Sequence, residues 1–341
     1  MAGNPTAENL VAQISDGQHT VKTLASMIEH KISNGFDLGR QQNLKGQHDN
    51  LNYKSATHVY KKQVHKSLLK RLSAHKTLGP FAWDGNITSL PFPNCAINSI
   101  GAVPYKDSPD RARVCDNSVA NADVSPPYFR MPALQQLRDR AFPYCYFAKS
   151  DIESAFPVMN IAYQDLPWML FSWYAPWDLE FKGTDRDFIY CHSHGNFGPR
   201  PLPYLFTMLM LYINLAAMAK DLQAPAAFID DNIHVGLLDE LMEDLPKYFE
   251  HLVLSGAPDK HSKRVSPFMF GDILGRWFDS RPPMTLSIPQ DKLTCLEGLV
   301  SDIIEVKQTT LLKAQQLLGF WEFCSTNVPK FLKAAHHERI C

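Results

Sequence analysis

Two adjacent carboxylates, Asp230 and Asp231, stand between two β-prone runs at residues 226–229 and 232–235. This pattern predicts a strand, a tight turn and a second strand, with the acids at the tip of the hairpin. Neighbouring carboxylates repel each other, and either solvent or a divalent cation relieves the repulsion. A solvated surface turn is the commoner origin of such a pair. The pair therefore indicates a metal site only if the chain supplies partners for it.

A third carboxylate, Asp151, follows a β-prone run at residues 144–148. A carboxylate at a strand end can hold a metal ion, and it can equally cap a short helix. A Gly/Pro loop at residues 196–203 lies between Asp151 and the pair and opens a long apolar helix. Two-metal nucleotidyl transfer needs such carboxylates, because two Mg²⁺ ions about 3.5–4 Å apart clamp the attacking and leaving oxygens. Together the three acids favour that chemistry.

Basic residues are concentrated in one stretch of the chain. No acidic residue occurs between residues 50 and 83, and apolar residues at helical spacing predict a helix over about 55–76. A basic face of this size is compatible with tracking nucleic-acid phosphates and, equally, with a solvated helix. Its members are Lys54, Lys61, Lys62, Lys66, Lys70, Arg71 and Lys76.

A second basic feature is a predicted hairpin, with strands at residues 96–104 and 111–115 and a turn between them. Lys106 lies in the turn and Arg113 on the returning strand. These cations could neutralise the oxygens of a triphosphate. An exposed hairpin with solubilising charges fits the same residues equally well.

The overall composition is that of an ordinary globular protein, with 341 residues, 45% hydrophobic and 20% charged, and a net charge of −1. No global field therefore indicates a polyanionic partner. Seven cysteines without a CxxC spacing predict a reducing, intracellular location rather than secretion. In the segment 191–194 a cysteine and two histidines lie too close together to surround one tetrahedral ion, so we expect an ordinary strand there.

The longest apolar run covers residues 202–219 and is long enough to suggest a transmembrane helix. It contains Pro203, Thr207, Tyr212 and Asn214 and lacks suitable basic flanks. A buried helix is the better interpretation, and we expect no membrane partner.

The remaining segments predict a mixture of helices and antiparallel strands. Residues 1–50 are helical in part and carry no recognisable chemistry. Further elements are expected as a short helix at 131–140, a strand pair at 170–174 and 188–191, a helix at 239–254, a basic loop at 259–264, a hairpin over 270–278 and 284–288, and closing helices at 289–305 and 309–325.

Five motifs in this order, with the basic hairpin before them, resemble the reverse transcriptases of retroelements over roughly residues 60–325. The first is residues 147–156, in which an aromatic, Phe156, follows Asp151 by five residues. The segment 197–206 resembles their Phe-Gly loop, and 228–231 resembles their Tyr-x-Asp-Asp box with Phe in place of Tyr. Residues 254–275, with Lys263, resemble the next two motifs, and Arg113 matches the basic hairpin.

The resemblance implies an α+β right-hand polymerase fold with an antiparallel palm sheet, fingers and a partial thumb. We accordingly expect an N-terminal helical or irregular extension at 1–54, fingers at 55–143, a palm with fingers insertions at 144–280, and thumb-like helices with a tail at 281–341.

The resemblance also implies an RNA-directed DNA polymerase that uses Mg²⁺, or Mn²⁺ in its place, on an RNA/DNA template-primer and deoxynucleotides. Asp151, Asp230, Asp231 and the main chain of Ile152 would hold metal, and Lys263, with Lys260 as a rival, would donate a proton to pyrophosphate. Phe156 would exclude a 2′-hydroxyl, although a core aromatic is the alternative. The implied nucleotide-binding residues are Lys106, Arg113, Phe156, Phe197 and Gly198, and the implied nucleic-acid-binding residues are Lys61, Lys62, Lys66, Lys70 and Arg71.

Several features depart from the family pattern. Pro199 and Pro201 stiffen the Gly loop, Tyr105 replaces a common Lys, and Arg113 lies one residue closer than usual to Asp116. No RNase H or integrase segment follows the thumb-like region, so we expect part of a longer polyprotein. Details at 280–289 and 111–115 are most similar to DIRS-like, tyrosine-recombinase retrotransposons.

Two other functions stay open at this point. A degenerate fold could bind nucleic acid without synthesis, which the stiffened loop and the lack of a nuclease favour. An RNA-dependent RNA polymerase would share the two-metal site, but the bulky Phe156 argues against it. The sequence does not specify an oligomeric state, a template or a host.

Overall fold

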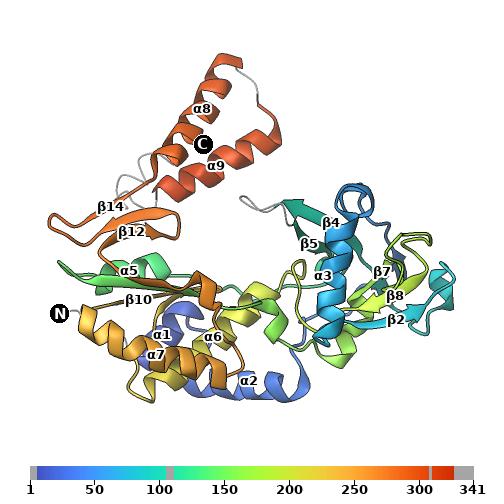
Figure 1. Ribbon diagram of the computed structural model, residues 1–341, viewed down its shortest axis with the longest axis horizontal. Helices are drawn as coiled ribbons and strands as arrows, with labels where there is room; N and C mark the ends of the chain where they lie inside the picture. The colour runs from blue at the N-terminus through green and yellow to red at the C-terminus, as the bar shows by residue number, and fades with distance from the viewer. Residues whose placement is uncertain (1–5, 105–110, 307–308, 326–341) are drawn as a thin grey trace.

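The predicted acids lie at one end of a four-stranded antiparallel sheet with the order β11-β6-β10-β9. The computed structural model, which describes residues 6–104, 111–306 and 309–325, places this sheet beside two others in an α+β architecture (Figure 1). Its strands are β6 (Tyr146–Asp151), β9 (Ala226–Phe228), β10 (Asp231–Gly236) and β11 (Val265–Phe268). The strands β6, β9 and β10 form where the sequence predicts them, whereas β11 was not predicted.

Both faces of the central strands of this sheet are covered, so most residues of β6 and β10 are buried, including the polar Ser150, Asn232 and His234. Helices α6 (Leu202–Met218) and α7 (Leu238–Leu254) lie on one side, where Tyr248 of α7 donates a hydrogen bond of 2.8 Å to Asn214 of α6. On the other side Phe147 and Ile233 pack with α5 (Ala133–Arg140) and with Phe278. The central strands β6 and β10 are therefore packed in the interior, whereas Val265 and Ser266 of the edge strand β11 are exposed.

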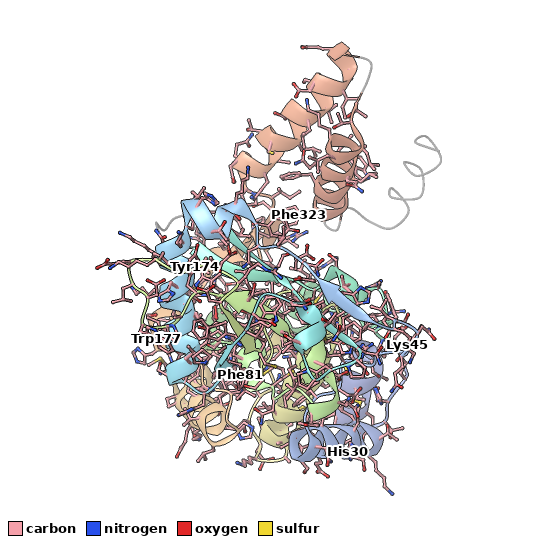
Figure 2. The ribbon with its side chains drawn as sticks, turned by 90° about the vertical axis from the view of Figure 1, so that its right-hand side faces the viewer. His30, Lys45, Phe81, Tyr174, Trp177 and Phe323 are labelled. Atoms are coloured by element: carbon pink, nitrogen blue, oxygen red, sulfur yellow. The ribbon has the colours of Figure 1, made fainter. Side chains whose placement is uncertain are left out.

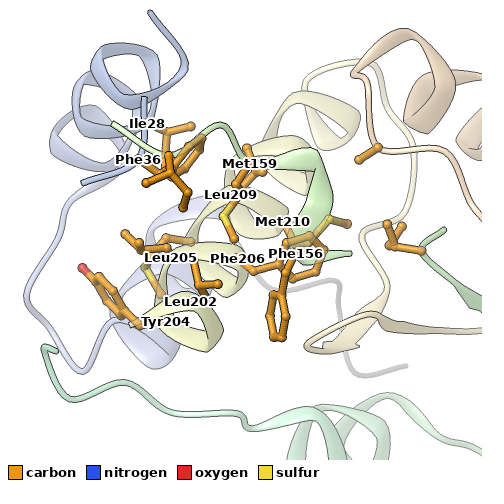
Figure 3. Packing of buried hydrophobic residues seen from close by; sticks show 14 of the residues in the cluster. Ile28, Phe36, Phe156, Met159, Leu202, Tyr204, Leu205, Phe206, Leu209 and Met210 are labelled. Atoms are coloured by element: carbon orange, nitrogen blue, oxygen red, sulfur yellow. The ribbon is translucent and has the colours of Figure 1, made fainter. Parts of the chain in front are cut away.

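The long apolar run forms α6, a buried helix, as predicted. Helices α1 (Ala7–Ile14) and α2 (Val21–Asn34) pack with α6 in one large apolar cluster (Figure 3). Among the described residues, no helix combines the length and apolarity that crossing a membrane requires. The N-terminal helices thus complete the core that supports the candidate site.

A second, five-stranded sheet has the order β1-β3-β7-β8-β2. Three of its strands lie in segments predicted as strands, namely β3 (Cys95–Ile97), β7 (Leu170–Trp173) and β8 (Phe188–Cys191). The other two, β1 (Gln47–Asp49) and β2 (Leu78–Ala82), were not predicted. Helix α3 (Lys61–Ser73), which follows a π-helical turn at Ser55–Val59, packs Val64 and Leu68 against Phe171 and Trp173 of this sheet. The predicted helix over 55–76 is therefore shorter than expected.

The predicted strand at 96–104 is divided at Asn98. The Asn98 side chain donates hydrogen bonds of 2.8 Å and 2.9 Å to the carbonyls of Trp168 and Leu170 and is fully buried. After this residue the chain leaves the five-stranded sheet and forms the hairpin of β4 (Ser99–Pro104) and β5 (Arg111–Asp116). Lys106 lies outside the described residues.

The third sheet contains β12 (Phe270–Ile273), β13 (Arg276–Asp279) and β14 (Thr285–Ser287). The sequence predicted only one hairpin here, but Leu274 and Gly275, with φ of 52° and 74°, make an additional two-residue turn. Helices α8 (Gln290–Val306) and α9 (Leu311–Ser325) follow and extend away from the remaining elements (Figure 1). The short elements are α4 (Ser118–Asn121) and 3₁₀ turns at Ile87–Ser89, Phe156–Val158, Tyr163–Trp168 and His261–Lys263.

A buried histidine makes the stability of this fold depend on pH. His234 of β10 meets Tyr248 edge-on at 4.6 Å, and burial, with a smaller effect of the Arg140 charge, lowers its pKa to about 3. The unfolded chain takes up a proton near pH 6.5, and the folded chain does not. We therefore expect stability to fall as pH drops from 6.5 toward 3, by at most about 1.4 kcal/mol per pH unit from this group.

Urea unfolding at pH 7 and pH 5 measures this loss, and His234→Gln should reduce it. The same exchange at His58, which is exposed, is the matched control. An equal loss in His234→Gln and the unsubstituted chain would assign the pH dependence to other groups.

Candidate active site

The strand register brings the three predicted carboxylates together. β10 pairs with β6 so that Asp231 lies directly opposite Asp151. The turn residue Asp230 accepts a hydrogen bond of 2.9 Å at its carbonyl from the main-chain N–H of Ile152. Opposed residues of an antiparallel pair have side chains about 4.5–5.5 Å apart at Cβ. The acids therefore converge although 79 residues separate Asp151 from Asp230.

The turn that carries Asp230 is strained. Phe228 pairs with Asp231, so only Ile229 and Asp230 connect β9 to β10, and Ile229 has a φ of 54°. A β-branched residue rarely adopts positive φ, and such strain costs about 1–3 kcal/mol. Ile229 packs against the large apolar cluster around α6, which holds the turn in this conformation.

Electrostatic repulsion is the main feature of the carboxylate cluster. Loss of surrounding water, followed by the charge of Asp151, raises the pKa of Asp230. The Asp231 side chain retains contact with solvent, yet the nearby protein and then Asp230 and Asp151 raise its pKa to about 6. The cluster is thus a site at which added positive charge is favourable.

Lys263 supplies part of that positive charge. Its ammonium donates a hydrogen bond to the Asp151 carboxylate, and this contact raises the pKa of Lys263. The rival residue Lys260 contributes its main-chain N–H instead, which donates to the Asp151 carbonyl at 2.7 Å. Of the two lysines, Lys263 has the side chain that reaches the acids.

The loop carrying both lysines is fixed by an ion pair that the sequence did not reveal. Arg264 contacts the buried carboxylate of Asp259 through two hydrogen bonds of 2.5 Å and 2.7 Å, and its guanidinium lies 3.9 Å above the Phe249 ring. Asp259 also forms an isolated bridge with Ile152. A spacing of five residues in a polar loop carries no recognisable signal for such a pair.

The donor set fits a hard divalent cation. Among the described residues, no three His, Cys, Asp or Glu side chains surround a single point. Mg²⁺ nevertheless commonly takes one or two protein carboxylates together with water and phosphate oxygens. Asp151, Asp230 and Asp231 provide carboxylate oxygens, whereas Ile152 has a hydrocarbon side chain and could contribute only its main-chain carbonyl oxygen.

The predicted nucleotide-binding aromatics also meet. Phe156 is 9% exposed, and its ring packs edge-to-face with Phe206 at 5.8 Å (Figure 3). It packs in the same way with Phe197 at 5.4 Å. Phe197 remains 55% exposed. Phe156 therefore belongs to the core and to the edge of the site at once, so the two interpretations offered by the sequence are compatible.

Gly198 joins this loop to the basic hairpin. A Cβ atom at Gly198, where φ is 142°, would lie 2.2 Å from the carbonyl oxygen of Cys115. The Cys115 N–H donates to the Phe197 carbonyl at 3.1 Å, and Asn121 donates to the Gly198 carbonyl at 3.0 Å. Arg113 lies on the strand that ends at this contact, opposite Ala102. The arrangement thus places the Arg113 strand beside the Phe-Gly loop.

The predicted basic face is only partly exposed. Lys62, Lys66 and Lys70 are exposed along α3. Lys61 lies over the rings of Tyr174 and Phe181, at 4.9 Å and 4.8 Å (Tyr174 is labelled in Figure 2).

Arg71 differs from the other basic residues of α3, because its guanidinium points inward. It donates hydrogen bonds of 3.3 Å and 3.4 Å to the carbonyls of Gly195 and His194, and burial lowers its pKa to about 10. Arg71 therefore connects α3 to the segment before the Phe-Gly loop and adds no charge to the exposed face.

A cavity of about 760 Å³ opens beside Asp231. It lies between the four-stranded sheet, the β12–β13 turn and α9, and its lining includes Lys149, Phe228, Asp231, Asp272, Arg276 and Phe323. Of these, only Asp231 was singled out from the sequence. The position of Lys149, two residues before Asp151 on the same strand face, is the one available signal.

Comparisons with known proteins identify the fold. No family model matches the sequence, and no curated protein matches it. Among solved structures, the foamy viral protease-reverse transcriptase in complex with double-stranded DNA has a TM-score of 0.57 and 14% identity, over 93% of this chain and 51% of that chain. The same viral protein with an RNA/DNA hybrid gives 0.57 and 13%, over 93% and 39%.

At these identities the likeness concerns the fold. The chain has an α+β fold with antiparallel sheets that matches viral reverse transcriptases, and it spans about half or less of those two chains. The expected fold class is confirmed, and the DIRS-like class stays a prediction.

The contact at Gly198 can be tested by adding a methyl group. Gly198→Ala should lower the free energy of unfolding by about 1–3 kcal/mol, because alanine is strained in this backbone conformation. The close approach of the methyl group to the Cys115 carbonyl should add to this loss. Gly298→Ala in α8 is the matched control, since nothing lies within 4 Å of its Cβ position. Urea unfolding of both variants measures the difference, and equal stabilities would contradict the close approach.

Proposed function

We propose that this chain is the polymerase part of a retroelement reverse transcriptase, an RNA-directed DNA polymerase that adds deoxynucleotides to a primer 3′-hydroxyl. The observation that supports it best is the register that sets Asp231 opposite Asp151, with Asp230 in the adjoining turn. The three carboxylates therefore lie near one another at one end of the sheet, and the pKa values of Asp230 and Asp231 are raised there. The fold match to viral reverse transcriptases supports the same conclusion.

In the proposed reaction the primer 3′-oxygen attacks the α-phosphorus of a deoxynucleotide, and the bond to pyrophosphate breaks. Bound Mg²⁺, or Mn²⁺, would supply activation of the attacking oxygen and charge neutralisation of the leaving group. Asp151 and Asp230, with the main chain of Ile152, would hold the metal, and Asp231 would lie near the primer end. Lys263 is protonated at neutral pH and would give its Nζ proton to pyrophosphate.

The surrounding residues would position the two substrates. Arg113 and Lys106 would neutralise the triphosphate, while Phe197 and Gly198 would contact the new base pair. Lys62, Lys66 and Lys70 provide an exposed row of positive charge for the phosphates of the template-primer. Lys61, which is half-buried, would add a further charge at the edge of this row. Because its donors are used by main-chain carbonyls, Arg71 would act by supporting this surface.

In this proposal the five-stranded sheet with α3 and the β4–β5 hairpin forms the fingers, the four-stranded sheet forms the palm, and α8 with α9 forms a partial thumb. Because β1 joins the five-stranded sheet, the fingers would also include the end of the predicted 1–54 extension. We further propose an intracellular setting and a DIRS-like origin, on the cysteine usage and the sequence details given above.

A nucleic-acid-binding module without synthesis is the second candidate. Pro199 and Pro201 lie in a loop that is also bonded to β5 and α4, so the loop has little freedom to close on a nucleotide. The experiment below distinguishes the two functions.

The central test is primer extension on an RNA template with Mg²⁺ or Mn²⁺. We expect Asp230→Asn to reduce deoxynucleotide incorporation by at least about a hundredfold, since it removes a metal-holding charge. Asp239→Asn, an exposed carboxylate at the start of α7, is the matched control and should extend primers normally. If the unsubstituted chain binds template-primer but incorporates nothing, the binding-module function replaces the polymerase.

A second test concerns the choice of sugar. Replacing Phe156 by Ala should raise ribonucleotide use relative to deoxynucleotide use by about 10–200-fold in kcat/KM, because space opens for the 2′-hydroxyl. Phe156→Ala also removes a buried ring, so Phe156→Leu serves as a variant that keeps more of the core.

Phe206→Leu, which alters the neighbouring ring in the core, is the control for packing effects on this selectivity. If neither Phe156 variant changes the ratio, or if Phe206→Leu changes it equally, Phe156 is a core residue and does not select the sugar.

A further inference from the structure

Arg71 joins the end of α3 to the segment that leads into the Phe-Gly loop. Its Nη2 group is shared among three main-chain carbonyls, those of Lys76 at 3.3 Å, His194 at 3.4 Å and Gly195 at 3.3 Å. Its Nε group donates to the Thr77 hydroxyl at 3.3 Å. One guanidinium therefore holds the backbone of two stretches of chain that are distant in the sequence.

The segment 193–195 is held from two sides. On one side it bonds to the chain that follows Phe156: the Ile161 N–H donates to the Ser193 carbonyl at 2.9 Å, and the Gly195 N–H donates to the Met159 carbonyl at 2.9 Å. On the other side lies Arg71, which takes up the two remaining carbonyls of this segment. The strand pairing nearby does not extend this far, since β2 and β8 end their ladder at Leu78 opposite Cys191.

The backbone that Arg71 holds presses directly on Phe156. A Cβ atom at Gly195 would lie 2.4 Å from the Phe156 carbonyl oxygen, so the two main chains are in close contact. Two residues after Gly195, the ring of Phe197 meets the ring of Phe156 at 5.4 Å. A shift of the backbone at Gly195 would therefore change the separation of the two rings.

We propose that Arg71 is a positioning residue, which fixes the separation of Phe156 and Phe197 through the carbonyls of His194 and Gly195 and thereby sets the selectivity for deoxynucleotides. Arg71 itself need not touch the nucleotide. The substrate named here rests on the proposed polymerase function, whereas the connection from α3 to the Phe-Gly loop stands on the contacts alone.

The chemistry of the arginine side chain supports this role. Burial lowers the pKa of Arg71 to about 10, so the guanidinium is still charged at neutral pH. A buried charge destabilises a protein unless polar groups satisfy it, and here main-chain carbonyls do so. The guanidinium and the carbonyls therefore hold one another in a fixed geometry. A lysine would offer a point charge in place of the planar fork.

The test uses the full chain with Arg71→Met and with Arg71→Lys, which keeps the charge and serves if Arg71→Met does not fold. Arg140→Met is the matched control, because Arg140 is also buried, also donates to a main-chain carbonyl, that of Ala224, and also has its pKa lowered to about 10 by burial. Lys70→Met controls for the loss of positive charge on α3, since Lys70 is exposed.

Three measurements separate positioning from stability. Hydrogen–deuterium exchange of the unliganded protein reports how firmly residues 193–198 are held. Urea unfolding reports the stability of each variant. Single-nucleotide extension on an RNA template reports kcat/KM for a deoxynucleotide and for the matching ribonucleotide, and KM for the primer.

We expect faster exchange at residues 193–198 in both Arg71 variants. The preference for deoxynucleotide over ribonucleotide in kcat/KM should fall about tenfold in Arg71→Met, the size of a lost hydrogen bond from a charged group, and by less in Arg71→Lys. KM for the primer should stay unchanged in these two variants and rise in Lys70→Met. Arg140→Met should lose stability and keep the preference for deoxynucleotides.

Unaltered exchange at residues 193–198 in Arg71→Met would overturn the proposal. Faster exchange with an unaltered sugar preference would show that Arg71 serves stability alone, and an equal fall of the preference in Arg140→Met would show the same. If the unsubstituted chain binds template-primer but incorporates nothing, the polymerase function fails and the selectivity role fails with it. The exchange result still decides whether Arg71 holds the segment before the Phe-Gly loop.

Discussion

The repulsion among Asp151, Asp230 and Asp231 is the constraint on which the rest of this structure depends. Loss of surrounding water, and then the neighbouring carboxylates, raise the pKa values of Asp230 and Asp231, so the arrangement persists only because the surrounding fold enforces it. Asp230 is held in place by the short turn between β9 and β10, in which the strained backbone of Ile229 is stabilised by apolar packing. Asp151 and Asp231 are held in place by the pairing of β6 with β10, because these strands are covered on both faces and cannot slip in register without exposing their apolar residues.

Local signals explain why the central elements could be predicted from the sequence. The β-prone runs around residues 144–151 and 226–235 predicted β6, β9 and β10, and the apolar run predicted α6, because both kinds of pattern reflect burial within a single element. The order of motifs then indicated that the strands pair. What the sequence could not supply is the choice between chemically equal neighbours: Lys263 reaches Asp151 with its side chain, whereas Lys260 reaches it with its main chain.

Residues whose role depends on distant partners were beyond sequence reasoning for the same reason. Arg71 has the spacing of an exposed basic residue, yet the carbonyls of His194 and Gly195 draw it inward. Asn98 looks like part of one strand, yet its amide satisfies two carbonyls from another segment and divides the strand. Both are set by backbone groups 70 or more positions away, and no periodicity within a helix or strand encodes them.

The contrast between the sheet end and the helices α8 and α9 has a physical consequence for any ligand between them. The carboxylates are attached to a doubly covered sheet and cannot adapt, so any adjustment to a bound strand must come from the opposite wall. That wall consists of α9 and the β12–β13 turn. The strands of the turn are attached to the sheet by the core packing of Ile273 and Phe278 with Phe147 and by the hydrogen bond from Lys149 to Asp272, and Arg276 attaches α9 to the turn. The turn is thus fixed to the sheet by buried contacts, whereas none of the residues of α8 and α9 whose exposure the structure describes is buried, so the helices are the part of this wall that the core does not hold.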